Sequence, residues 1–202
     1  MNRLFACLVI LALSVTTHAE SLTPPNTEAA GGIIYGQTWA FMVNSPSGWS
    51  MTRQSGLPVS AAFFQDHPTD QASNKSPSFM YITVTTVDAQ TVTLTELEQQ
   101  DEADFRAESK DLTISPGPVL SAADKQPVII RRFDNTRDGR CELVAYHRYA
   151  DAMYKIVLSA PSSSSLDQHK TSFAKLVSSF VGMHIKFEPG AQQSTPRNDV
   201  GK

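Results

Sequence analysis

The segment from Gln126 to Ala160 carries the strongest structural pattern in the chain, and it limits what the rest can form. Apolar and polar side chains alternate along it, β-branched and aromatic residues are frequent, and Asp138–Gly139 and Ala150–Asp151 interrupt it. Asp-Gly favours a two-residue turn, because both of its positions need a positive φ. The pattern therefore predicts three antiparallel strands joined by two tight turns.

These turns also predict which side chains share a face. A turn at Asp138–Gly139 would place Arg131 opposite Tyr146, and a turn at Ala150–Asp151 would place His147 opposite Tyr154. Side chains alternate across a strand, so the register divides them into two groups. The predicted core face carries Val128, Ile130, Leu143, Ala145, His147, Tyr149, Tyr154, Ile156 and Leu158. The opposite, mixed face carries Ile129, Arg131, Phe133, Val144, Tyr146, Arg148, Met153, Lys155 and Val157.

The mixed face is the predicted binding surface. Its candidate residues for an anionic partner are Arg131, Tyr146, Arg148 and Lys155. Arginine binds carboxylates bidentately, and tyrosine adds amphipathic contact area. The alternative is that an acidic helix, expected from Thr95 to about Ser109, covers part of this face and pairs its carboxylates with these cations. The sequence leaves both interpretations open.

His147 and Tyr154 belong to the predicted core face, where two further interpretations stand. One is a core histidine whose ring is hydrogen-bonded, for example to Tyr154. The other is a pocket between sheet and helix, in which His147 and Tyr154, with Arg131, would serve a small-molecule binder or a hydrolase.

The two ends of the chain predict export and a single folded unit. Residues 1–19 combine Arg3, an apolar run and the small residue Ala19, the parts of a signal peptide cleaved after Ala19. Residues 20–32 are expected to form a linker and residues 188–202 a disordered tail. One domain would therefore span residues 33–187 of a periplasmic or secreted protein.

Composition excludes several classes of function. The chain has 17 Lys and Arg against 20 Asp and Glu, which argues against general nucleic-acid binding. No second apolar stretch is long enough to span a membrane as a helix. Once the signal is removed, Cys141 is the single cysteine, and we expect a buried thiol rather than an intermolecular disulfide.

No catalytic or metal-binding motif stands out. The chain has no H-x-x-x-H, C-x-x-C or G-x-S-x-G pattern. Ser172 to Lys175 matches S-x-x-K, but the companion S-D-N and K-T-G elements of that chemistry are absent. We therefore expect no cofactor, no metal and no enzymatic activity.

The remaining elements complete the predicted fold. Strands are expected within Ile33–Val43, Val59–Gln65 and Phe79–Val87. Thr95 and Glu98 fit a capping box that would begin the acidic helix. Apolar residues at helical spacing predict a second helix from Leu166 to Val181, ended by Gly182. These elements predict an α+β fold, a mostly antiparallel sheet with helices packed on it.

One segment resembles a known family. The residues from Phe41 to Trp49, FMVNSPSGW, resemble the F-x-x-x-x-P-x-G-W opening of PsbP-like domains, and the likeness continues to about Ile185. It implies an antiparallel sheet sandwiched by helices. The family consists mostly of non-enzymatic accessory or binding proteins, and its secreted bacterial members are largely uncharacterised. The resemblance thus implies a binding or accessory module that contacts an unknown protein partner; a structural component of an envelope assembly is the further alternative.

Overall fold

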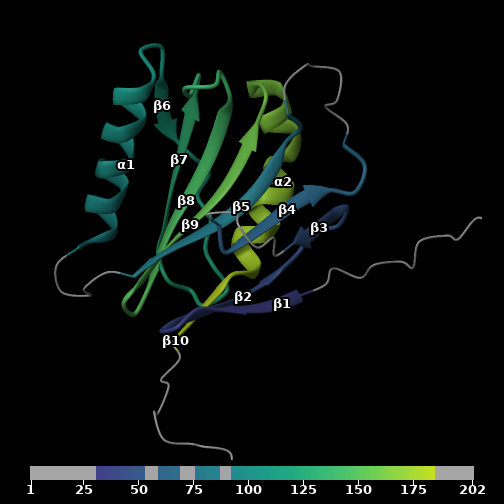
Figure 1. The fold of residues 1–202 in the computed structure, drawn as a ribbon, viewed down its shortest axis with the longest axis vertical. Helices are drawn as coiled ribbons and strands as arrows, with labels where there is room; N and C mark the ends of the chain where they lie inside the picture. The colour runs from purple at the N-terminus through teal and green to yellow at the C-terminus, as the bar shows by residue number, and fades with distance from the viewer. Residues whose placement is uncertain (1–30, 53–58, 69–75, 87–91, 185–202) are drawn as a thin grey trace, which may run out of the picture.

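The computed structural model describes residues 31–52, 59–68, 76–86 and 92–184, which form two antiparallel sheets and two helices (Figure 1). The predicted signal peptide, most of the predicted linker and the predicted tail lie outside the described residues. The larger sheet has seven strands in the order β3-β4-β5-β9-β8-β7-β6. They are β3 Trp49–Thr52, β4 Ala61–Gln65, β5 Phe79–Thr86, β6 Thr113–Pro116, β7 Val128–Asp134, β8 Cys141–Tyr149 and β9 Ala152–Ala160.

The predicted meander forms β7, β8 and β9, with one correction of register. The second turn is confirmed, since Tyr149 pairs with Ala152 and His147 with Tyr154. In the first hairpin Arg131 faces Val144, and Tyr146 instead faces Ile129, a shift of two residues. The cause is a longer loop: strand pairing ends at Asp134–Cys141, and the backbone N–H of Thr136 donates to the carbonyl of Arg140 at 2.9 Å.

This shift leaves each side chain on its predicted face of the sheet, because side chains alternate with a period of two. The predicted core face contributes Ile130, Leu143, Tyr154 and Ile156 to the main core. That core also contains Leu166, Phe173, Leu176 and Val177 of helix α2. The mixed face forms a second, smaller core around Phe133, Val144, Tyr146 and Val157.

A second sheet of three strands is built from the two ends of the described region. It consists of β1 Gly31–Tyr35, β2 Trp39–Asn44 and β10 Val181–His184, in the order β1-β2-β10. The single strand expected at Ile33–Val43 is therefore a hairpin. Gly182, expected to end a helix, lies inside β10, where a Cβ would clash with the Cβ of Tyr149.

The two helices begin slightly earlier than predicted. Helix α1 spans Leu94–Glu108, and its capping box joins Thr93 and Glu96 instead of Thr95 and Glu98. Helix α2 spans Ser163–Ser179, and its N-cap is Ser162, whose hydroxyl accepts from the backbone N–H of Ser165. Neither helix in the described ranges combines the length and apolar character that a membrane span requires.

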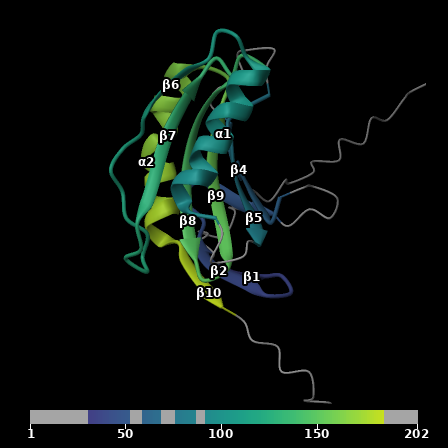
Figure 2. The same ribbon diagram turned by 90° about the vertical axis from the view of Figure 1, so that its left-hand side faces the viewer.

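The helices lie on opposite faces of the seven-stranded sheet (Figure 2). Helix α2 and the three-stranded sheet share the main core, while α1 packs over β7, β8 and β9 on the other face. In Figure 1, α1 lies beside β6 and β7, far from β3 and β4. The fold is thus α+β, an antiparallel sheet with helices packed on it, and α1 covers only part of its own face.

Cys141 is a free thiol at the start of β8 and is 5% exposed. Burial is the largest cause that raises its pKa, which disfavours the reactive thiolate. The expectation of a buried thiol is confirmed.

Candidate functional site

Helix α1 supplies partners for two of the four predicted binding residues. Arg131 forms ion pairs with Glu98 and, at 3.3 Å, with Glu102. The ammonium of Lys155 donates to both carboxylate oxygens of Asp101, at 3.0 and 3.1 Å. These contacts confirm the interpretation in which the acidic helix covers part of the mixed face.

The other two residues of that set are also held by the protein itself. Tyr146 is fully buried, and burial, followed by the charge of Asp101, raises the pKa of its phenol. Arg148 is half-buried and donates to the backbone carbonyls of Val92, at 2.8 Å, and Ala150. The structure brings the four residues to one face but does not leave them as an open cationic surface.

The predicted pocket at His147 and Tyr154 is replaced by packed core. Both residues are 0% exposed. His147 Nε2 lies 2.9 Å from a carboxylate oxygen of Asp124, not from Tyr154, and the Tyr154 hydroxyl donates to the carbonyl of Ala40 at 3.0 Å. The two side chains join the two sheets and are out of reach of a ligand.

Helix α1 packs on one face of the seven-stranded sheet, here called the α1 face. Among the described residues, the part of this face formed by β4 and β5 is not covered by α1. Strand pairing aligns side chains into rows that continue from the covered half to the open half. One row runs Glu142–Ser159–Phe79–Phe64, the next runs Val144–Val157–Tyr81–Ala62, and a third runs Tyr146–Lys155–Thr83. A candidate site therefore spans the border between α1 and the uncovered strands.

The uncovered strands carry an apolar groove of about 670 Å³. Its lining residues are Val59, Ala62, Phe64, Ser76, Pro77, Phe79, Tyr81 and Thr83. Three rings follow one another along it: Phe64 lies 6.3 Å from Phe79, and Phe79 stacks on Tyr81 at 5.9 Å. Phe64 is 41% exposed, so the groove opens to solvent.

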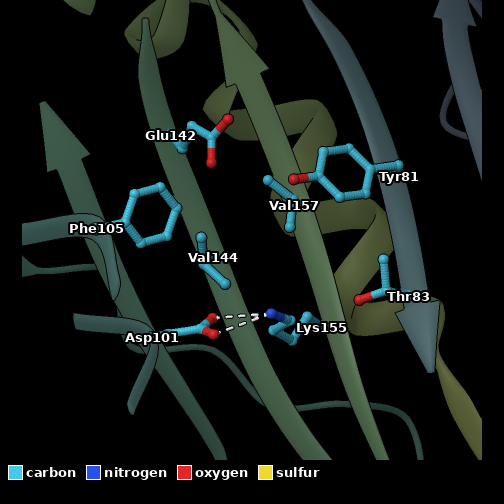
Figure 3. A pocket seen from close by; sticks show the side chains of 8 residues that line it. All are labelled: Tyr81, Thr83, Asp101, Phe105, Glu142, Val144, Lys155 and Val157. Carbon is cyan, nitrogen blue, oxygen red and sulfur yellow. Dashed lines mark hydrogen bonds and ion pairs between the residues drawn. The ribbon is translucent and has the colours of Figure 1, made fainter. Parts of the chain in front are cut away.

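A smaller polar pocket of about 100 Å³ adjoins the groove beneath α1 (Figure 3). Its lining residues are Tyr81, Thr83, Asp101, Phe105, Glu142, Val144, Lys155 and Val157. Tyr81 and Thr83 line both spaces, so the two are continuous along β5. Figure 3 shows Glu142 at one end and the Lys155–Asp101 pair at the other, with the hydroxyls of Tyr81 and Thr83 pointing toward them.

Two polar groups of this pocket have raised pKa values. Burial is the largest cause that raises the pKa of Glu142, although Ser159, Arg140 and Lys155 act against it. Burial also raises the pKa of Tyr81, and the charges of Glu142 and Asp101 add to the effect. The Thr83 hydroxyl is buried and has no hydrogen-bond partner among the described residues. Perturbed groups gathered in a cleft are typical of a functional site.

Arg140 fixes the end of the groove next to Glu142. Its guanidinium donates to the carbonyls of Ser76 and Pro77, at 2.9 and 3.1 Å, and to the hydroxyl of Ser159 at 2.8 Å. It also lies 5.0 Å from the centre of the Phe79 ring. These bonds orient the groove wall, and they engage the guanidinium group of Arg140 in contacts within the protein.

The site suits binding better than covalent chemistry. Within residues 31–52, 59–68, 76–86 and 92–184, no group of three metal-ligating side chains gathers. The pocket lining has one aliphatic hydroxyl, Thr83, and no histidine to act as its base. What the two linings offer is two carboxyl groups, the ammonium group of Lys155, three hydroxyls and an apolar wall.

Sequence reasoning missed Glu142, Tyr81 and Thr83. The alternation of Phe79, Tyr81 and Thr83 along one face of their strand was visible in the sequence. Their meeting with Glu142 depends on β5 pairing with β9, a contact between segments far apart in the chain. No local pattern predicts that neighbour.

Replacing Glu142 by glutamine is expected to change how stability depends on pH. Because burial raises the pKa of Glu142 in the folded state, the unfolded state loses this proton first as pH rises. The contribution of protonated Glu142 to the free energy of unfolding is therefore complete below the pKa that Glu142 has in the unfolded state. It is lost as pH rises through the pKa that Glu142 has in the folded state. Urea unfolding at pH 4 and pH 8 should show Glu142→Gln gaining on the wild type at the higher pH.

The matched control is Glu108→Gln, which removes an exposed carboxylate at the end of α1. A Glu142→Gln gain no larger than that of Glu108→Gln, or a gain confined to pH 4, would contradict the cause assigned to Glu142.

Comparison with known proteins gives a likeness to solved structures and none to known sequences. No protein-family model matches the sequence, and no curated protein matches it. Among solved structures, the chain is similar to the solution structure of cyanobacterial PsbP from Synechocystis sp. PCC 6803, with 16% sequence identity and a TM-score of 0.47. The match covers 71% of this chain and 86% of the cyanobacterial one. A likeness of this size assigns neither family nor function.

Proposed function

We propose that the protein is a non-enzymatic binding module and that it binds through the apolar groove and the polar pocket. The observation that supports this is that, among the described residues, α1 covers only part of its face of the sheet, and a groove of about 670 Å³ lies beside the helix. An apolar groove with a few polar groups at one end has the character of a ligand site. The carboxyl of Glu142 and the hydroxyl of Thr83, which has no hydrogen-bond partner within the described part of the chain, provide such groups.

We also propose that the protein is exported and that its domain is of PsbP-like fold. Export rests on the signal-peptide pattern of residues 1–19, and the mature protein would begin at Glu20. The proposed fold rests on the segment from Phe41 to Trp49. In that segment Phe41 is 0% and Trp49 6% exposed, and the backbone N–H of Trp49 closes a turn onto the carbonyl of Pro46.

The test of groove binding is capture by immobilised protein from the envelope fraction of the producing cell. Proteins and small molecules retained by the wild type are identified by mass spectrometry. Phe64→Glu places a charge in the groove, and we expect it to lower the amount of the specific ligand at least tenfold. Val119→Glu is the matched control, because Val119 is apolar, 100% exposed and outside the groove.

Equal retention by the three proteins would contradict binding through the groove. Turnover of a retained small molecule by the wild type would contradict the non-enzymatic part of the proposal.

A second candidate function is docking to a partner protein through the three-stranded sheet. Ile33, Tyr35 and Met42 are 58%, 60% and 40% exposed, and Ile33 pairs with Met42 across the strands. Exposed apolar groups that lie together often mark protein contacts. Tyr35→Glu in the same capture experiment separates the two candidates, since it would release a partner held by this sheet and leave a groove ligand bound. A role in an envelope assembly would also show as co-sedimentation that Tyr35→Glu abolishes.

A further inference from the structure

We propose that two copies of this chain associate through strand β1, which pairs antiparallel with β1 of the second copy about a twofold axis. The two three-stranded sheets would then join into one, in the order β10-β2-β1-β1-β2-β10. This inference rests on the second candidate function, because it takes the three-stranded sheet as a docking surface. It adds the identity of the partner, and it does not depend on the groove.

Strand β1 presents an open edge. Among the described residues it pairs with β2 alone, and Figure 2 shows it on the outer side of β2, away from β10. The backbone N–H of Gly36 donates to the carbonyl of Trp39 at 2.8 Å, so these two residues form a hydrogen-bonded pair. Such pairs alternate along an antiparallel ladder with pairs that are not hydrogen-bonded. The backbone N–H and C=O groups of Gly31 and Ile33 therefore point away from β2.

The opposite edge of the same sheet is occupied by the chain itself. Strand β10 forms that edge, and the backbone N–H of Gly182 donates to the carboxylate of Asp124 at 3.2 Å. The backbone N–H of Ala123 donates to the carbonyl of Phe180 at 3.0 Å. A strand added beside β10 would break such bonds, whereas a strand added beside β1 would break none of them. Strand β1 also lacks the charged residues and prolines that commonly protect an edge strand.

The side chains of β1 are complementary to those of a second copy. Antiparallel pairing centred on Ile33 places this residue opposite itself, in a hydrogen-bonded pair, because its backbone groups point outward. The same register places Tyr35 opposite Gly31 of the second copy, so a large side chain faces a residue without one at both ends. An aromatic ring opposite a glycine is a stabilising arrangement in sheets. Ile33 and Tyr35 are 58% and 60% exposed, and pairing would remove apolar area of both from water.

The outer face of the sheet continues this contact without opposing charges. Ile33 pairs with Met42, and Met42 pairs with Val181, so one apolar row would run through both copies. Strands β1, β2 and β10 contain no Lys, Arg, Asp or Glu, so the twofold axis brings no like charges of these strands together. A second copy also presents β1 already ordered, whereas an extended segment of another protein would lose conformational entropy on pairing. These points favour a second copy as the partner.

The test is sedimentation velocity of the purified protein at concentrations from about 1 to about 500 µM. Because β1 has five residues, the contact is small, and we expect a reversible dimer with a dissociation constant on the order of 10–100 µM. Ile33→Pro removes the N–H that points away from β2, and it should raise this constant at least tenfold. Ile33→Val keeps the N–H and an apolar side chain, so it is the matched control and should change the constant less than about threefold. Circular dichroism checks that both variants are folded.

Disulfide formation locates the contact without a proline. In the proposed pair the two Cα atoms at position 33 are about 5.5 Å apart, which is within the reach of a disulfide. Position 42 lies one strand further from the axis in each copy, so its two Cα atoms are about 14 Å apart. Under mild oxidation Ile33→Cys should form a linked dimer, and Met42→Cys, at a residue that is 40% exposed, should not. The wild type, whose Cys141 is buried, is the blank.

A protein that stays monomeric over the whole range, or a dimer that folded Ile33→Pro leaves unchanged, would overturn the inference. No linked dimer with Ile33→Cys would also overturn it, as would equal linking with Met42→Cys, which would indicate sheets packed face to face. A monomer that still captures another protein, with capture lost in Tyr35→Glu, would leave the second candidate function in place and remove only the second copy as its partner. None of these outcomes bears on the groove, which the capture experiment with Phe64→Glu tests.

Discussion

Replacement of Phe180 by alanine is expected to lower the free energy of unfolding by about 3–5 kcal/mol. Phe180 follows α2, is 0% exposed and stacks on Phe41 with ring centres 5.3 Å apart. Its ring also meets the edges of Tyr154 at 5.0 Å and His147 at 5.1 Å. Phe180 thus contacts residues of both sheets within the central aromatic cluster, and its loss would leave a cavity there.

Urea unfolding followed by circular dichroism measures this effect, and Phe64→Ala is the matched control. Phe64 is 41% exposed and lines the groove, so the same substitution there should cost less than about 1.5 kcal/mol. Equal costs at the two positions would show that Phe180 is not the anchor that its contacts indicate.

Replacement of Asp124 by alanine is expected to cost about 2–3 kcal/mol, because it leaves buried polar groups without partners. One carboxylate oxygen lies 2.9 Å from His147 Nε2 and also accepts the backbone N–H of Gly182 at 3.2 Å. The other accepts the backbone N–H of Gln126 at 3.0 Å. Asp124 therefore joins the segment before β7 to β8 and β10, one strand from each sheet.

A double-mutant cycle with His147→Leu separates the histidine from the backbone contacts. In the His147→Leu background, Asp124→Ala should cost at least about 1 kcal/mol less than it does in the wild type, because the buried imidazole is no longer present. Additive effects in denaturant unfolding would show that the His147–Asp124 contact does not stabilise the fold.

The faces of the meander could be predicted from sequence, whereas one of its turns could not. Alternation has a period of two, so the two-residue error in the first hairpin leaves Arg131 and Val144 on the expected face. Asp138–Gly139 lies inside a longer loop, in which Asn135 has a φ of 61° and the backbone N–H of Gly139 donates to the carbonyl of Thr136. The dipeptide alone did not reveal these bonds.

Helix starts show the same limit of local patterns. Two overlapping capping boxes are present, Thr93 with Glu96 and Thr95 with Glu98. The structure uses the first, and Glu98 is instead 4% exposed and paired with Arg131, on the face of the sheet that α1 covers. The two local options thus differ in a tertiary ion pair that the sequence pattern does not show.

The candidate site depended on strand order, which the sequence did not predict. Pairing of Lys155 and Arg131 with the acidic helix was one of two open interpretations, since both belonged to predicted elements. The polar pocket requires β5 beside β9, which places Tyr81 and Thr83 next to Val157 and Lys155. Only the assembled sheet brings Glu142 to the same pocket.

Site-specific photo-crosslinking in the producing cell tests directly whether the apolar groove is the binding site. p-Benzoylphenylalanine in place of Phe64 puts the probe in the groove, and the same residue in place of Val119 puts it on a surface outside the groove. We expect one defined adduct, identified by mass spectrometry, to form at position 64 and not at position 119. The same adducts at both positions, or no adduct at position 64, would contradict the claim that the groove is the binding site.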